Sequence, residues 1–107
     1  MVNSISSIVK LLEEPRKKRS GQNISPMEVR AQFPPARNNN SQIFAKLIFW
    51  GELSEGVLNY YKPNDYLIIE GYVSLKTKQT TTSFIPHIEI TVLKVYPFLL
   101  TLNLDRY

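Results

Sequence analysis

The sequence predicts an all-β fold with one short inserted helix, in which five strands close into a small barrel. Two observations carry this prediction. Several short stretches alternate apolar with polar residues, which is typical of strands with one buried face. Segments rich in proline, glycine and asparagine separate these stretches and favour turns. At 107 residues, the chain is long enough for a single domain with one modest core.

Three candidate strands occupy the first half of the chain. Residues 4–12 are largely apolar, but the run is too short for its pattern to distinguish a helix from a strand, and Pro15 ends either one. Residues 27–33 alternate strictly and predict a second strand. Residues 43–50 are dense in β-forming residues and predict a third, after a break at two prolines and three asparagines.

A short helix is expected after the third strand. Apolar residues at spacings of four, five and eight from Leu53 fit one face of a helix that extends to Tyr61. Ser54 can cap its N-terminus, and Pro63 ends it.

Two further strands complete the pattern. Residues 66–75 alternate, and Gly71 inside this stretch predicts a bulge or a sharp bend. Residues 76–83 are polar and are expected to form a hairpin loop, before a final strand that ends near Tyr96. Three strands, a helix and two strands follow one another in the order of the oligonucleotide/oligosaccharide-binding (OB) barrel.

The third strand would carry two aromatic rings and a lysine on one surface. Side chains alternate faces along a strand, so Phe44, Lys46 and Trp50 point the same way. Rings that stack bases, beside cations that hold phosphates, are what binding of single-stranded nucleic acid requires. Packing in the core is the alternative interpretation of both rings.

Other basic and aromatic residues could extend this surface. Tyr72, Lys76 and Lys78 share one parity and would continue the track, although Tyr72 could equally pack against a cross-strand neighbour. Four consecutive basic residues follow the first candidate strand: Arg16, Lys17, Lys18 and Arg19. They predict either phosphate contacts or a solvated turn. Arg30 and Arg37 are further candidates for phosphate contacts.

Composition argues against catalysis and metal binding. The chain has no cysteine and a single histidine, His87, so neither a disulfide framework nor a zinc cluster is expected, and no cofactor is implied. We expect His87 at the surface or at an interface. The acidic residues are scattered and no glycine-rich phosphate loop occurs, so an enzyme is not expected.

No apolar run approaches about 18 residues, which argues against a membrane span. Because the net charge is only +4, the arrangement of the cations matters more than their number.

Several motifs resemble the bacterial single-stranded DNA-binding protein family. Residues 49–53 read FWGEL, which matches the aromatic-Gly-x-Leu turn that closes the family's third strand. The E-G pair at residues 70–71 and the E-P pair at residues 14–15 fall where the family has an E-G pair and a D-P pair. The segment QFPPAR, residues 32–37, is similar to the cyanobacterial and plastid-encoded branch. The resemblance covers most of the chain, residues 2–96.

This resemblance implies an OB barrel that assembles as a homo-oligomer, a dimer or tetramer, and coats single-stranded DNA in replication and repair. Phe44 and Trp50 fall on two of the family's stacking positions. A third falls near Lys78, where no aromatic residue is present, and a fourth falls in residues 34–37, where Phe33 is the nearest ring. The branch implies the plastid stroma, at the nucleoid, or the cyanobacterial cytoplasm. RNA binding stays open, because stacking does not read the 2′-hydroxyl.

The end of the chain departs from the family pattern. Residues 1–97 are expected to form the OB domain, and residues 98–107 a short apolar extension. The chain ends TLNLDRY, without the acidic tip through which family members recruit replication enzymes, so such recruitment is not expected. The alternative function is a tail-less OB subunit that binds proteins or assembles a primosome, with little DNA binding of its own.

The basic run provides a first test of phosphate binding. Replacing all four basic residues of 16–19 with serine should lower the slope of log affinity against log salt for single-stranded DNA, by about 0.7 for each phosphate that the run binds. Fluorescence titration at several salt concentrations measures that slope. An unchanged slope identifies the run as solvated surface.

Overall fold

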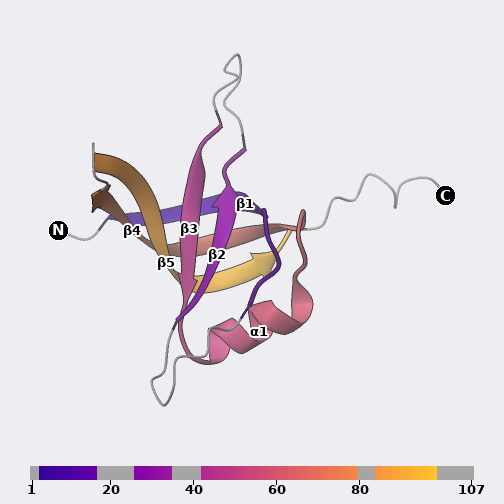
Figure 1. Ribbon diagram of the computed structural model, residues 1–107. Coiled ribbons are helices and arrows are strands. Elements are labelled where there is room, and N and C mark those ends of the chain that lie inside the picture. Colours follow the sequence, from indigo (N-terminus) through magenta and orange to yellow (C-terminus); the bar gives the residue numbers. More distant parts are fainter. Residues whose placement is uncertain (1–2, 17–25, 35–41, 80–83, 99–107) are drawn as a thin grey trace.

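A barrel of five strands with one helix forms the described part of the chain, which in the computed structural model comprises residues 3–16, 26–34, 42–79 and 84–98 (Figure 1). The elements are β1 (Ser4–Leu11), β2 (Met27–Gln32), β3 (Phe44–Phe49), α1 (Glu52–Tyr60), β4 (Tyr66–Gln79) and β5 (Phe84–Pro97). The barrel closes in the order β1-β2-β3-β5-β4. β3 and β5 run parallel, and the other neighbouring strands run antiparallel. The predicted five-stranded OB barrel is confirmed.

The first apolar run, whose pattern fits either a helix or a strand, forms the strand β1. It pairs with β4 along nearly its whole length, from Ser4 opposite Tyr72 to Lys10 opposite Tyr66, and its end also pairs with β2. β4 pairs with β1 from Ser4 to Lys10, and β2 pairs with it only at Lys10 and Leu11. Tertiary pairing therefore decides a conformation that a short apolar run cannot decide locally.

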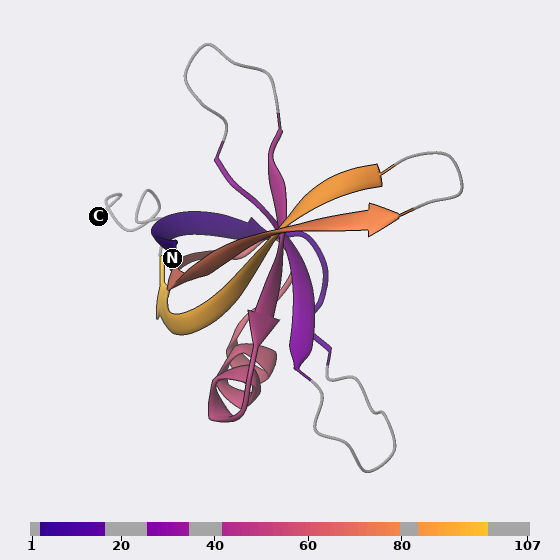
Figure 2. The same cartoon turned by 90° about the vertical axis from the view of Figure 1, so that its left-hand side faces the viewer.

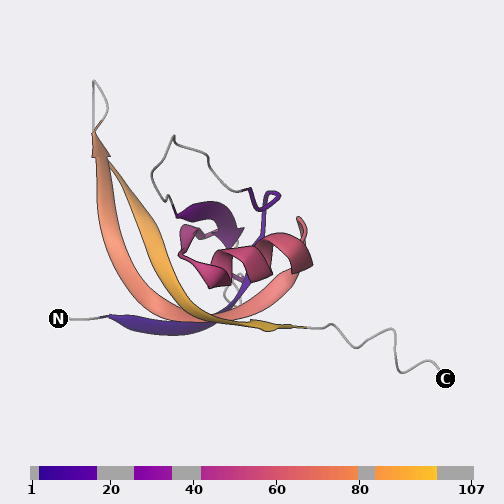
Figure 3. The same cartoon turned by 90° about the horizontal axis from the view of Figure 1, so that it is seen from below.

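The core lies inside the barrel and is built from alternate residues of each strand. The helix adds Val57 and lies against one end of the barrel (Figure 3). The buried apolar residues are Val9, Leu11, Met27, Val29, Ala31, Ala45, Leu47, Phe49, Val57, Leu67, Ile69, Ile90 and Val92. Because the side chains of a strand alternate, the intervening residues face outward. The core thus determines which residues of β2, β3, β4 and β5 are available at the surface.

The helix begins one residue before the expected start, and Ser54 is not its cap. Gly51 holds the N-cap position with a φ of 62°, a conformation that favours glycine. Ser54 lies within the first turn, and its hydroxyl donates a hydrogen bond to the Gly51 carbonyl over 2.6 Å. The prediction was wrong because the left-handed turn at Gly51 starts the helix without a side-chain cap. Among the described residues, no helix is long and apolar enough to cross a membrane.

The hairpin of β4 and β5 is longer than expected and extends away from the barrel (Figure 2). Residues 76–79, predicted as loop, belong to β4 and pair with β5 as far as Gln79 opposite Phe84. Their polarity misled the prediction, because a two-stranded ribbon outside the barrel can be solvated on both faces. Residues 80–83 lie outside the described part. Leu75, which is 75% exposed, marks where the ribbon has left the core.

The bulge predicted at Gly71 is present, with its extra residue on the partner strand. Glu70 pairs with Lys94 and Gly71 with Val92, so Leu93 is left without an opposite residue. A Cβ atom at position 71 would lie 2.1 Å from the Thr91 carbonyl oxygen. Only glycine permits this approach of two backbones, and both strands curve strongly along their length (Figure 3).

The expected boundary between residues 97 and 98 stays a prediction. β5 ends at Pro97, and the backbone N–H of Phe98 donates to the carbonyl of Tyr66 over 3.3 Å. The Phe98 ring meets the Tyr66 ring edge to face, with 6.5 Å between centroids. Residues 99–107 lie outside the described part of the chain.

Substitution of Gly71 tests the close approach. Gly71→Ala should lower the free energy of unfolding by more than about 2 kcal/mol, because the added methyl group overlaps the Thr91 carbonyl. Gly56→Ala is the matched control: nothing lies within 4 Å of a Cβ at that helical position, and it should stabilise the fold by about 0.5–1 kcal/mol. Urea denaturation measures both. Equal effects of the two substitutions would contradict the role given to Gly71.

Candidate nucleic-acid interface

β3 presents two aromatic rings to solvent, one at its start and one directly after its end. Phe44 is 42% exposed and Trp50 is 52% exposed, whereas Ala45, Leu47 and Phe49 between them are buried. Lys46 lies between the two rings on the same outward side and is half-buried. The predicted parity is therefore confirmed. Packing of either ring in the core is excluded by its exposure.

The strand register extends this surface across four strands. Lys46 lies opposite Arg30 of β2 and opposite Glu89 of β5, and Glu89 lies opposite Ser74 of β4. The adjacent row runs through Glu28, Ile48, Thr91 and Tyr72 in the same strand order. We call the outer surface formed by these two rows, with Phe44, Trp50 and Lys76, the aromatic face. In the barrel order, only β5 lies between β3 and β4. The chain order does not reveal this arrangement.

The β4 residues of the predicted track divide into described and undescribed side chains. Tyr72 is 43% exposed and lies in register with Thr91, so it stands on the surface rather than in the core. Lys76 is exposed and lies opposite His87. The backbone of Lys78 pairs with Ile85, but its side chain lies outside the described part.

Two carboxylates on the aromatic face lie beside basic side chains. The Lys46 ammonium lies 3.7 Å from the Glu28 carboxylate, with about a third of each side chain exposed. The His87 Nε2 atom lies 3.0 Å from the Glu89 carboxylate. Sequence reasoning considered the cations and missed these two acids, although their positions in alternating strands share the parity of Arg30 and His87. Lys46 is consequently not an unshared cation.

The other candidates from the sequence have different environments. Arg30 is exposed beside Lys46, and its backbone N–H donates to the Glu13 carboxylate over 3.0 Å. Arg16 is exposed after the end of β1. Phe33, the ring nearest to the fourth stacking position, is half-buried and packs against the core, and its part in stacking stays a prediction. Four candidates lie outside the described residues: Lys17, Lys18, Arg19 and Arg37.

The aromatic face offers stacking surfaces and phosphate-binding groups. In the described ranges, no three histidine, aspartate or glutamate side chains come together as a metal site would require. Exposed rings at both ends of β3, with Lys46 and Arg30 between them, can stack bases and contact phosphates at the same time. The arrangement is chemically suited to binding an unpaired strand.

Comparison with known proteins identifies relatives over nearly the whole chain. The chain is 38% identical over 103 residues to the "Putative single-stranded DNA-binding protein ycf41" of Trieres chinensis, and the match covers 92% of this chain and 91% of that protein. It is 27% identical over 84 residues to the thylakoid-associated single-stranded DNA-binding protein slr1034 of Synechocystis, covering 78% of this chain and 65% of that protein. No family model matches the sequence.

The fold has close structural counterparts. The crystal structure of a small single-stranded DNA-binding protein from Streptomyces coelicolor superposes with a TM-score of 0.76 at 10% identity, covering 92% of this chain and 95% of that one. At such low identity this likeness supports the fold alone. The sequence relationship over 91% of the Trieres protein identifies the family. The chain belongs to the family of single-stranded DNA-binding proteins represented by ycf41.

Proposed function

We propose that the chain binds single-stranded DNA on the aromatic face and coats it during replication and repair. The observation that carries this proposal is the pair of exposed rings, Phe44 and Trp50, with the half-buried Lys46 between them on one strand. Bases stack on the rings, and Lys46, Arg30 and Lys76 contact phosphates. Tyr72 adds a third ring in the row next to Lys46. The family of the chain supports the choice of ligand.

The proposed mode of binding tolerates any base sequence. Each stacked base contributes about 1–3 kcal/mol, since every base has a flat face, and phosphate contacts do not depend on the base. Such contacts do not distinguish DNA from RNA, because none of them reads the 2′-hydroxyl. Titration with single-stranded DNA, single-stranded RNA and duplex DNA therefore separates an unpaired-strand binder from a general polyanion binder.

The carboxylates of Glu28 and Glu89 moderate affinity in this proposal. A phosphate that binds Lys46 must either displace the Glu28 carboxylate or share the Lys46 ammonium with it. The carboxylate lies 3.7 Å from the ammonium. Repulsion between Glu89 and the phosphate adds to that cost. Binding is thus weaker and less sensitive to ionic strength than the number of nearby cations alone suggests.

Assembly and location are part of the same proposal. We infer a homodimer or homotetramer, which the resemblance to the bacterial family supports, and a place of action in a plastid or a cyanobacterial cell. The name of the Synechocystis relative associates that protein with thylakoids, which supports the choice of compartment.

A second candidate function is a protein-binding OB subunit with weak DNA binding. Two observations favour it: Phe33 packs against the core, and acids accompany two of the basic groups on the aromatic face. The exposure of both Phe44 and Trp50 favours the first function. Exposed aromatic rings that bind nothing would lower the solubility of the protein. A gel shift with single-stranded DNA at low salt, together with light scattering, decides between the two functions.

Removal of the Trp50 ring tests the stacking role. Trp50→Ala should weaken binding of oligothymidine at least about tenfold while leaving the fold intact, because the ring is 52% exposed and supports stacking rather than the core. Fluorescence anisotropy of a labelled oligonucleotide measures affinity. Tyr96→Ala, at an exposed tyrosine of β5 outside the aromatic face, is the control and should bind normally. Equal affinities of Trp50→Ala and the unaltered protein would exclude stacking on Trp50.

Neutralising Glu28 tests the competition with phosphate. Glu28→Gln should raise affinity for oligothymidine about two- to fivefold at low salt, the range of a surface ion pair, and the gain should shrink as salt is added. Isothermal titration at two salt concentrations measures both effects. Glu55→Gln makes the same charge change on an exposed position of α1 and serves as control. A loss of affinity in Glu28→Gln would show that the carboxylate positions Lys46 instead of competing for it.

A further inference from the structure

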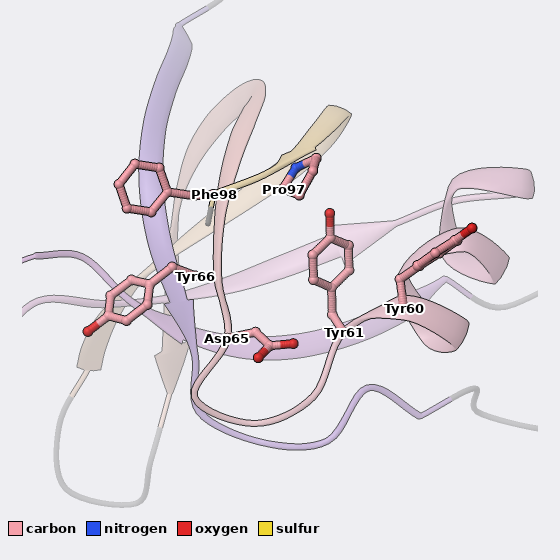
Figure 4. A pocket seen from close by; sticks show the side chains of 6 residues that line it. All are labelled: Tyr60, Tyr61, Asp65, Tyr66, Pro97 and Phe98. Carbon is pink, nitrogen blue, oxygen red and sulfur yellow. The ribbon is translucent and has the colours of Figure 1, made fainter. Parts of the chain in front are cut away.

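A second cluster of aromatic rings lines a pocket at the end of the barrel away from Trp50. The pocket lies between the end of α1, the start of β4 and the end of β5, and its volume is about 430 Å³. Its lining residues are Tyr60, Tyr61, Asp65, Tyr66, Pro97 and Phe98. Figure 4 shows Phe98 and Tyr66 on one side, and Tyr61 and Tyr60 on the other. This tyrosine pocket has the size and apolar lining of a site for a small planar group.

The walls of the tyrosine pocket are held in place by backbone contacts. The N–H of Leu11 donates to the Asp65 carbonyl over 2.9 Å, which ties the turn before β4 to β1. The Asp65 carboxylate accepts a hydrogen bond from the Lys62 N–H over 2.9 Å. Burial raises the pKa of the Tyr61 phenol, and the charge of Asp65 raises it further, so the ring stays uncharged at physiological pH. The pocket is therefore preformed.

Tyr60 differs from the other lining residues because it is 80% exposed. Stacking a base on a tyrosine ring at the rim of a preformed pocket costs little conformational entropy, because the side chain has few rotatable bonds. The ring has no role in the core. Substitution at this exposed position should leave the barrel unaltered, which makes Tyr60 suitable for testing the pocket.

One row of outward-facing residues connects the tyrosine pocket to the aromatic face. Phe44 lies opposite Gln32 on β2, Gln32 lies opposite Lys10 on β1, and Lys10 lies opposite Tyr66 on β4. Lys10, Gln32 and Tyr66 also line a smaller hollow of about 150 Å³, together with Phe33 and Pro34. Tyr66 belongs to both cavities. The surface is thus continuous from the first ring of β3 to the rings of the pocket.

The chemistry along this row is that of a path for an unpaired strand. A ring, an amide, a cation and a second ring follow one another over four neighbouring strands. Two stacking positions therefore flank a polar group and a phosphate-binding group. Inside the pocket the charged side chain is Asp65, which repels phosphate but can accept a hydrogen bond from an N–H group of a base, including the ring N–H of thymine. The arrangement assigns the phosphate to Lys10 and the base to the pocket.

We propose that a single strand bound on the aromatic face continues past Phe44 along this row, so that Lys10 holds a phosphate and a base enters the tyrosine pocket. This inference rests on the proposed function and adds a second binding segment to it. The occupant is DNA rather than a second copy of the chain, because the cation of the row and the continuity with the aromatic face match a polyanion with flat bases. One barrel then holds a longer stretch of DNA than the aromatic face alone.

Dependence on oligonucleotide length tests the second segment. An oligothymidine of about 6 nucleotides should occupy the aromatic face alone, whereas one of about 16 nucleotides, the upper range for one OB barrel, should reach the pocket as well. Tyr60→Ala and Lys10→Gln should each weaken binding of the longer oligonucleotide at least about fivefold and leave the shorter one unaffected. Because Trp50 is the single tryptophan, quenching of its emission reports occupancy of the aromatic face in both variants.

Matched controls separate stacking and charge from general effects. Tyr60→Phe keeps the ring and should bind as the unaltered protein does, and Lys94→Gln removes an exposed lysine of β5 outside the row. Normal binding of the longer oligonucleotide by Tyr60→Ala and Lys10→Gln, while Trp50→Ala still loses affinity, would overturn the second segment and leave the proposed function standing. Unaltered binding by Trp50→Ala would instead overturn the proposed function. A change of mass in Tyr60→Ala by light scattering, without a length-dependent loss, would make the pocket a contact between copies and also overturn the inference.

Discussion

The approach of the Gly71 backbone to the Thr91 carbonyl is the constraint on which the surface of the barrel depends. At this point the two longest strands shift register, and Leu93 absorbs the extra residue. The register beyond the bulge places Tyr72 opposite Thr91 and Ser74 opposite Glu89, in the rows that continue through β5 to Ile48 and Lys46 of β3. A slip of one residue would reverse every side chain of the strand between core and solvent. One missing Cβ therefore helps to set which β4 side chains join the rings of β3.

Closure of the barrel distributes the binding chemistry over strands that are distant in the sequence. β5 lies between β3 and β4, so Glu89 stands beside Lys46 and His87 stands opposite Lys76. The same closure places β1 between β2 and β4, which puts Lys10 between Gln32 and Tyr66. Both arrangements come from the pairing of neighbours in space. They explain why one barrel can display rings and cations on two connected surfaces.

Balance of charge on the aromatic face fits reversible coating of a strand better than tight capture. A surface of cations alone would hold phosphates strongly and release them slowly, whereas the acid next to Lys46 reduces the gain from a phosphate contact there. In the proposed mode of binding, the rings then carry a larger share of the affinity. Stacking is less sensitive to salt than phosphate contact is, so the balance between the two shapes how binding responds to ionic strength.

The sequence by itself determined the pattern of strands, the position of the helix, the bulge at Gly71 and the outward direction of the β3 rings, because alternation assigns each strand residue to one of two faces. Tertiary structure decided the rest. Residues 4–12 became a strand only through pairing with β4, and residues 76–79 joined a solvated ribbon only because β5 pairs with them. The acid beside Lys46, the inward packing of Phe33 and the row that leads to the tyrosine pocket each join residues of different strands. Local periodicity determines which face of the sheet a side chain occupies, whereas strand order and register determine which side chains lie beside it.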